Sequence, residues 1–143
     1  MTRDVLITIV STQIEEDQKL TTELITSGKL KKTAKGFEIA YAESETTGFA
    51  GSNTILSVEG ENLVTMNRTG ACSSQLIIEK GNKHRCHYGT PYGEFIVGIA
   101  TRYIKSDLSE NGGTLEFSYT LDINSSYIAD FELSLKIEEE KGK

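Results

Sequence analysis

Several features that mark common classes of protein are scarce or missing in this sequence of 143 residues. It has one proline and two cysteines, and no apolar run approaches the length of a membrane-spanning helix. The first ten residues, MTRDVLITIV, contain an apolar run of six residues, which is too short for the core of a secretory signal. We therefore expect a cytoplasmic protein that does not enter a membrane.

Basic residues are in the minority. The 15 Lys and Arg residues face 21 Asp and Glu residues, which gives a formal net charge of -6 at pH 7. A protein whose main task is to bind a phosphate backbone needs the opposite balance. We interpret the one dense basic stretch, Lys29 to Lys35, as a solvated turn beside a strand end, where lysines discourage edge pairing. Nucleic acid is therefore not an expected partner.

Motifs of known catalytic and cofactor-binding classes are also missing. The sequence has no G-x-S-x-G elbow, H-E-x-x-H helix, P-loop or dinucleotide fingerprint. Cys72 and Cys86 lack C-x-x-C spacing, and in a reducing compartment we expect both to be packed free thiols. His84 and His87 fall on opposite faces of one expected strand, so they are not expected to share a metal. We predict no metal and no cofactor, and whether the protein is an enzyme stays open.

What the sequence does contain is an alternation of apolar and polar residues, repeated many times with turn residues between the runs. The run from Leu115 to Ile123 and the run from Phe131 to Ile137 flank Asn124-Ser125-Ser126 and predict a hairpin. About ten such runs occur, and a sheet of that size tends to close on itself. The predicted fold is one all-β domain over residues 1–143, a closed antiparallel, calycin-like (lipocalin-type) β-barrel of about eight to ten strands.

Polar side chains share a strand face with apolar ones at three places in this pattern. Six of them are our candidate ligand-binding residues: Tyr41, Glu43, Glu45, Arg68, His84 and Tyr88. If their faces line the barrel interior, Arg68 must have a partner, because an unpaired buried charge costs several kcal/mol. Glu43 or Glu45 is the expected partner. Cys86 lies on the face of His84 and could be a nucleophile, although a packed thiol is the simpler interpretation.

Two interpretations of these residues stay open. In the structural one, Arg68 and a glutamate form an internal ion pair near a barrel end, with His84 and Tyr88 hydrogen-bonded to it. In the functional one, they form the floor of a pocket for a small polar or anionic molecule, which makes the protein a binding module. This interpretation predicts an internal cavity of a few hundred cubic ångströms that reaches solvent, and a barrel filled by side chains with Arg68 fully paired to a glutamate would contradict it. The alternatives are an enzyme that uses His84 as acid or base on a small substrate, and a structural or partner-binding protein. The last would act through exposed aromatics such as Phe49 and Tyr127, or as a homodimer.

Longer motifs in the chain point to a family. They are Tyr41 with Glu43-Ser44-Glu45, Arg68-Thr69-Gly70-Ala71, Glu79-Lys80-Gly81 with His84, and Thr90-Pro91-Tyr92-Gly93. In combination they resemble the YwiB-like family of small uncharacterised bacterial proteins, and the likeness covers nearly the whole chain. The resemblance implies a domain of unknown function with a calycin-type, lipocalin-like barrel in a bacterial cytoplasm, and it supplies no catalytic residue. The run Arg85-Cys86-His87 departs from the family pattern, which has apolar or aromatic residues there.

Overall fold

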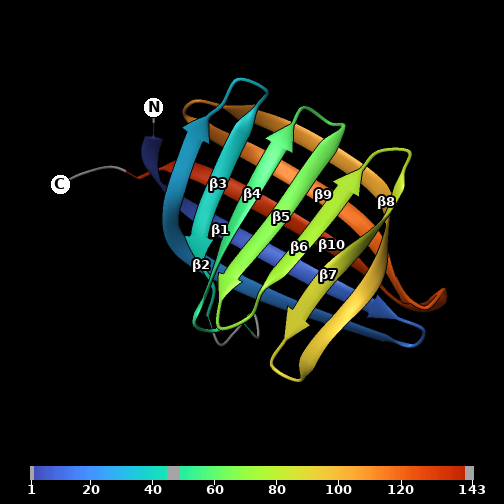
Figure 1. Cartoon of the computed structure of the whole chain (residues 1–143). Coiled ribbons are helices and arrows are strands. Elements are labelled where there is room, and N and C mark those ends of the chain that lie inside the picture. Colours follow the sequence, from blue (N-terminus) through green and yellow to red (C-terminus); the bar gives the residue numbers. More distant parts are fainter. Residues whose placement is uncertain (1, 45–48, 141–143) are drawn as a thin grey trace.

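A computed structural model describes residues 2–44 and 49–140 of the chain, and every regular element in these ranges is a β-strand (Figure 1). The ten strands are β1 (Thr2–Glu15), β2 (Gln18–Lys32), β3 (Phe37–Ala42), β4 (Ser52–Glu59), β5 (Leu63–Gly70), β6 (Ser74–Glu79), β7 (Lys83–Thr90), β8 (Gly93–Ser109), β9 (Gly112–Ile123) and β10 (Ser126–Glu139). Within the described ranges, no helix has the length and apolar character needed to cross a membrane.

The strands form one closed antiparallel barrel. Their order around the wall is β1-β10-β9-β8-β7-β6-β5-β4-β3-β2, and β2 returns to pair with β1. Every strand therefore pairs with its neighbours in the sequence, and β10 closes the ring against β1. Figure 1 shows the short strands β3 to β6 in front of the longer strands β1, β9 and β10. The prediction of a closed antiparallel barrel is confirmed.

The predicted hairpin at the C-terminal end is confirmed as β9 and β10. Its two turn residues are Asn124 and Ser125, with φ angles of 54° and 68°. Positive φ at both central positions is the backbone of a type I′ turn, whose twist matches that of the flanking strands. Ser126, which the sequence pattern placed in the turn, is the first residue of β10. The loop between β9 and β10 therefore consists of two residues.

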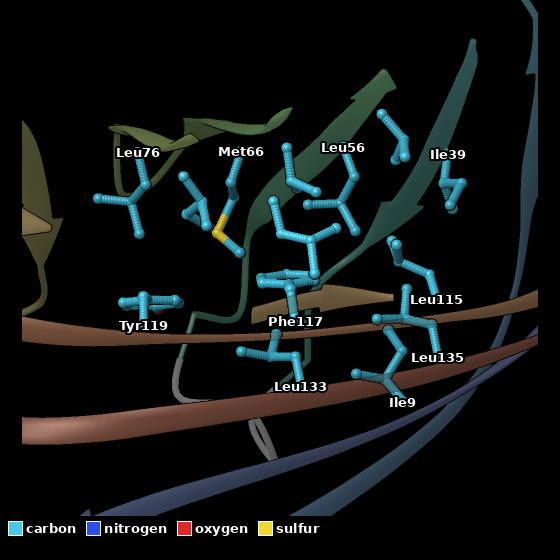
Figure 2. Close-up of a cluster of buried hydrophobic side chains, with 14 of the residues drawn as sticks. Ile9, Ile39, Leu56, Met66, Leu76, Leu115, Phe117, Tyr119, Leu133 and Leu135 are labelled. Carbon is cyan, nitrogen blue, oxygen red and sulfur yellow. The ribbon is translucent and has the colours of Figure 1, made fainter. Parts of the chain in front are cut away.

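The interior of the barrel is filled by apolar side chains (Figure 2). Ile39, Leu56, Met66 and Leu76 project from β3 to β6, and they face Phe117 and other side chains from β9, β10 and β1. Each of these five residues is at most 2% exposed. Packing of this kind removes apolar surface from water, which is the main stabilising contribution to folding. These side chains from opposite walls meet across the middle of the barrel.

One expected alternation breaks inside β8. The sequence pattern predicts a single inward face running through Phe95, Val97, Ile99, Thr101 and Tyr103. Val97 and Ile99 are buried as expected, but Phe95, near the β7–β8 turn, is 41% exposed, so the expectation for it was wrong. The β8–β9 register also shifts between Thr101 and Tyr103. A β-bulge adds one residue to its strand and so exchanges the two faces beyond it. Ile104 is therefore buried at 7% exposure, and the expectation for Tyr103 was wrong.

Candidate functional site

The strand register aligns polar side chains in one row across the barrel wall. Direct cross-strand partners connect Tyr41 to Thr54, Thr54 to Arg68, Arg68 to Ser74, and Ser74 to Tyr88. The first four are buried and Tyr88 is half-buried. The adjacent row, which starts at Ile39, is apolar and belongs to the filled core. The polar row therefore forms a layer at one end of the barrel interior.

Glu43 and Arg68 form a buried ion pair in this layer. The distance from Arg68 Nη2 to Glu43 Oε2 is 3.2 Å, and the two side chains are 6% and 2% exposed. Glu43 follows β3 directly, and its backbone N–H donates to the Ser52 carbonyl of β4 at 2.9 Å, so it is still held against the barrel wall. The prediction that a glutamate pairs with Arg68 inside the barrel is confirmed for Glu43. Glu45, the other predicted partner, lies outside the described residues.

Thr54 joins the two charges, and the candidate residues predicted from the sequence did not include it. Its hydroxyl donates to Glu43 Oε2 and accepts a hydrogen bond from Arg68 Nε at 3.3 Å. Thr54 is completely buried on the face of β4 that also carries Leu56 and Val58. The sequence did offer a signal for Thr54, because it alternates with Leu56 and Val58 and so lies on the same inward face. A buried threonine hydroxyl can donate one hydrogen bond and accept another, so Thr54 can bond both charged side chains that flank it.

Phe49 covers the guanidinium group. Arg68 Cζ lies 3.8 Å from the centroid of the Phe49 ring, which is within the range of a cation–π interaction. The same ring meets Tyr88 edge to face, with a centroid distance of 6.4 Å and an interplanar angle of 73°. Phe49 is half-buried, so the expectation that it is an exposed contact residue was wrong. Tyr127, the other aromatic of that expectation, is 51% exposed.

Three tyrosines surround the ion pair as neutral hydroxyl groups. Burial raises the pKa of Tyr41 well above its usual value, and the charge of the neighbouring Glu43 carboxylate raises it further, while Arg68 opposes the shift. Burial also raises the pKa of Tyr88 and of Tyr119, and Arg68 again opposes the rise. Desolvation favours the uncharged phenol in each case. Near neutral pH the layer therefore offers phenol O–H groups beside one guanidinium and one carboxylate.

His84 does not join this layer. It lies on the same strand as Tyr88 but four residues earlier, which corresponds to about 13 Å along a strand. Its Nε2 is 2.8 Å from the Glu79 carboxylate, and its side chain is 31% exposed. The expectation that His84 is hydrogen-bonded to the Arg68 ion pair was wrong, because parity fixes the face of a side chain and not its height along the barrel. His87 lies on the opposite face, as predicted, 3.4 Å from Glu94.

Cys86 occupies a gap between two strands. The described residues of β6 and β7 pair at two positions, Ser74 with Tyr88 and Gln75 with His87, and then the strands diverge. The Ile77 backbone N–H donates to Cys86 Sγ at 3.3 Å, in place of a ladder bond. Burial raises the pKa of the Cys86 thiol, so the reactive thiolate is disfavoured. The interpretation of Cys86 as a packed thiol agrees with these contacts.

A hollow opens on the outer face of the barrel, away from the polar layer. It has a volume of about 300 Å³, and Lys83, Arg85, Gly98 and Asp122 are among its lining residues. A Cβ added to Gly98 would lie 2.6 Å from a carboxylate oxygen of Asp122, so a larger residue there would require the Asp122 side chain to move. Lys83 is already paired with Asp122 at 2.7 Å. We place the candidate site at the interior layer instead, where every charged group is buried.

Comparison with known proteins identifies a family and a related structure. The family described as "Domain of unknown function (DUF1934)" matches residues 7–135. The crystal structure of the ywiB protein from Bacillus subtilis superposes with a TM-score of 0.82 at 20% sequence identity, covering 98% of this chain and 94% of that one. At this identity the likeness concerns the fold. The comparison with curated proteins gives no match.

Proposed function

The chain belongs to the family of the domain of unknown function DUF1934, and from this premise we propose that its barrel is a binding module for a small anionic molecule. The ligand would bind at the polar end layer, with its anionic group on the Arg68 guanidinium. The observation that carries the proposal is the buried guanidinium itself, 6% exposed, with hydroxyl groups beside it and one aromatic ring over it. This combination of few polar groups and apolar walls is typical of small-molecule sites.

The energetic cost of the ion pair supports a functional role. Moving two charges out of water is expensive, and replacing a buried pair by apolar residues is often neutral or stabilising. The rest of the barrel interior is apolar and well packed, so the fold does not need Arg68 and Glu43 for its core. A buried ion pair that the core does not require for stability, and that neighbouring side chains hold in place, is a candidate for ligand binding.

The filled core limits where the ligand could lie. Below the polar layer, Leu56 and Met66 are at most 2% exposed and belong to the apolar core, and Arg68 is already paired with Glu43. The ligand that we propose therefore does not lie in the open internal cavity expected from the sequence, but enters from above the layer. Above the layer, the Phe49 ring rests on the guanidinium. A ligand with a planar anionic group and an apolar or aromatic body could replace this ring and keep the interaction with the guanidinium. Aromatic carboxylates fit this description.

A change at Glu43 is needed to balance charge. An anion placed beside Arg68 would meet the Glu43 carboxylate, and two anions would then share one buried cation. A neutral amide at position 43 removes the conflict, because its carbonyl still accepts from Thr54 and its amide group can donate to the ligand.

An enzyme that uses His84 as acid or base is the alternative function. The contact that favours it is Glu79, whose carboxylate lies 2.8 Å from His84 Nε2 and could orient the ring as in catalytic pairs. Because His84 lies away from the polar layer, the two sites would not act on one small substrate. A substrate screen tests this alternative, since a His84→Ala variant with unchanged activity on every substrate found would exclude it.

The setting of the protein is also part of the proposal. We infer a bacterial cytoplasm from the resemblance to the YwiB-like family. A comparison with lipocalin-like barrels supports small-molecule binding by analogy of fold, which is weaker support than the site itself.

Two experiments test the binding function. Native mass spectrometry of protein purified without added ligand would reveal a retained small molecule. In the second, benzoate is titrated into ¹⁵N-labelled protein while the Arg68 Nε–Hε resonance is followed. We expect this resonance to shift and saturate. The double variant Glu43→Gln/Arg68→Met, which removes both charges together, should weaken benzoate binding about tenfold or more, as expected for a lost charge-assisted contact.

The matched control is Arg3→Met, which removes an exposed arginine paired with Glu139 at 2.6 Å. It should leave benzoate binding unchanged. Equal benzoate affinity in the double variant and the wild type, with both folded by circular dichroism, would contradict the proposed site.

A further inference from the structure

The first ten residues of β2, Gln18 to Ser27, have a strand partner on one side. Throughout this stretch, in the part of the chain that the structure describes, β2 pairs with β1 alone. β3 joins β2 only from Gly28 to Lys32, where Gly28 pairs with Tyr41. One row of backbone N–H and C=O groups therefore lies along an edge without a paired strand. Such edges readily accept a strand from another chain.

This edge has few of the features that prevent pairing. It contains no proline, and the register between β1 and β2 runs without a bulge from Thr2 opposite Lys31 to Glu15 opposite Gln18. Leu20 and Ile25 are 63% and 60% exposed on its two faces. Edge strands that stay single are usually short, bulged, or interrupted by proline. A long regular edge with exposed apolar side chains is an interaction surface.

The charges on the edge fit a second copy of the same chain. Between Gln18 and Ser27 the charged residues are Lys19 and Glu23. In an antiparallel pair of identical strands, a twofold axis normal to the sheet places one residue opposite itself. An axis at Thr21 places Lys19 opposite the partner's Glu23, and it does so twice. An axis at Glu23 would oppose like charges, which destabilises a strand pair.

We propose that two copies of this chain dimerise by antiparallel pairing of β2 with β2 about a twofold axis at Thr21. The dimer joins the two barrel walls into one continuous sheet across the interface. It does not depend on the ligand site, and Arg68 and Glu43 lie outside the paired edge. Each half of the interface is closed by one cross-strand ion pair between Lys19 and the partner's Glu23.

Charge reversal tests the proposal without disturbing the fold, because both residues are exposed. The wild type should show a mass twice the 15.7 kDa of one chain by light scattering. Lys19→Glu turns two attractive pairs into two repulsive ones, and we expect dimerisation to weaken about tenfold or more. Glu23→Lys should do the same. The double variant Lys19→Glu/Glu23→Lys should recover the dimer, and so should a mixture of the two single variants.

A cysteine at the axis tests the register. Directly opposed residues of antiparallel strands have Cα atoms about 4.5 to 5.5 Å apart, which suits a disulfide. Thr21→Cys should therefore crosslink rapidly under mild oxidation. The matched control is Thr114→Cys, an exposed threonine on β9, which has strand neighbours on both sides. Crosslinking of Thr22→Cys in place of Thr21→Cys would overturn the proposed register.

Two results would overturn the dimer itself. One is a monomer for the wild type at every concentration up to that of an NMR sample. The other is a dimer whose dissociation constant is unchanged in both single charge variants, because such a dimer uses another surface. A monomer that recruits an extended peptide of another protein to β2 would also contradict the proposal, since it assigns the edge to a different partner.

Discussion

The Phe49 ring lies over the Arg68 guanidinium, with its centroid 3.8 Å from Cζ. This contact places an aromatic side chain from the β3–β4 connection between a buried cation and the outside of the barrel. Below the guanidinium are Glu43 and Thr54, to which Arg68 is already bonded. A ligand that contacts Arg68 from this side would therefore have to displace the Phe49 ring.

The ion pair makes a prediction about stability. Arg68→Met leaves the Glu43 carboxylate buried without its partner, and we expect a loss of about 3 to 5 kcal/mol in the free energy of unfolding. The double variant Glu43→Gln/Arg68→Met leaves no buried charge and should recover most of that loss. Urea denaturation of the wild type, both single variants and the double variant measures the coupling. Additive losses would show that the two side chains do not interact.

Phe49→Ala tests whether the Phe49 ring occupies the position that we assign to the ligand over the Arg68 guanidinium. The variant loses a cation–π contact, which contributes about 0.5 to 2 kcal/mol, and should be less stable by that amount. It also vacates the position that we assign to the ligand body, so benzoate should bind more tightly than to the wild type. Isothermal titration calorimetry measures both affinities. A benzoate affinity reduced by Phe49→Ala would mean that the ring supports the ligand and does not cover its position.

The position of Glu43 predicts that removing its charge favours an anionic ligand. In the wild type, benzoate on Arg68 would lie beside the Glu43 carboxylate, which already pairs with the guanidinium at 3.2 Å. Glu43→Gln removes this like-charge repulsion, so benzoate should bind more tightly than to the wild type. Isothermal titration calorimetry measures both affinities, and a weaker affinity in Glu43→Gln would contradict the proposed position of the ligand.

The buried tyrosines predict a loss of stability at alkaline pH. Tyr41, Tyr88 and Tyr119 have raised pKa values in the folded state, mainly because of burial, whereas in the unfolded chain they ionise near the usual 10.0. Above that pH the unfolded state releases protons that the folded state keeps, so stability falls as pH rises. Melting temperatures from pH 8 to pH 11 should show this decline. Tyr119→Phe should make it less steep, and an unchanged slope would assign the decline to other groups.

Thiol reactivity provides a further test. Cys72 and Cys86 are 7% and 5% exposed, and burial raises the pKa of Cys86. Because the thiolate is the reactive species, a disulfide reagent should modify both cysteines far more slowly in the folded protein than in urea. Fast modification of Cys86 in the native state would show that the gap between β6 and β7 opens readily.

The strands and their inward faces could be predicted because alternation is a local property of the sequence. Phe37, Ile39 and Tyr41 mark the inward face of β3 by themselves. Arg68 has the same parity as Met66, which predicted that Arg68 is buried and therefore needs an acidic partner. Glu43 is that partner. A charge on an apolar face is conspicuous in a sequence, because its burial requires compensation.

The remaining features of the site depend on register, which the sequence does not reveal. His84 and Tyr88 share a face, but the pairing of β6 with β7 ends before it reaches His84. Phe49 lies in a connection without periodicity, so nothing in the pattern predicted its position over Arg68. The bulge in β8 likewise moved Tyr103 out of the expected face through a single shift of pairing.

The short contact between β6 and β7 makes this part of the wall different from the rest. Elsewhere the pairs of strands share longer ladders, up to the fourteen positions that connect β1 with β2. Backbone amides that face the gap, near Ile77 and Cys86, are held by a thiol contact and not by a carbonyl. We expect these amides to exchange their hydrogens with solvent earlier than the other strand amides of the barrel wall. Local opening of the closed barrel would then begin at this gap.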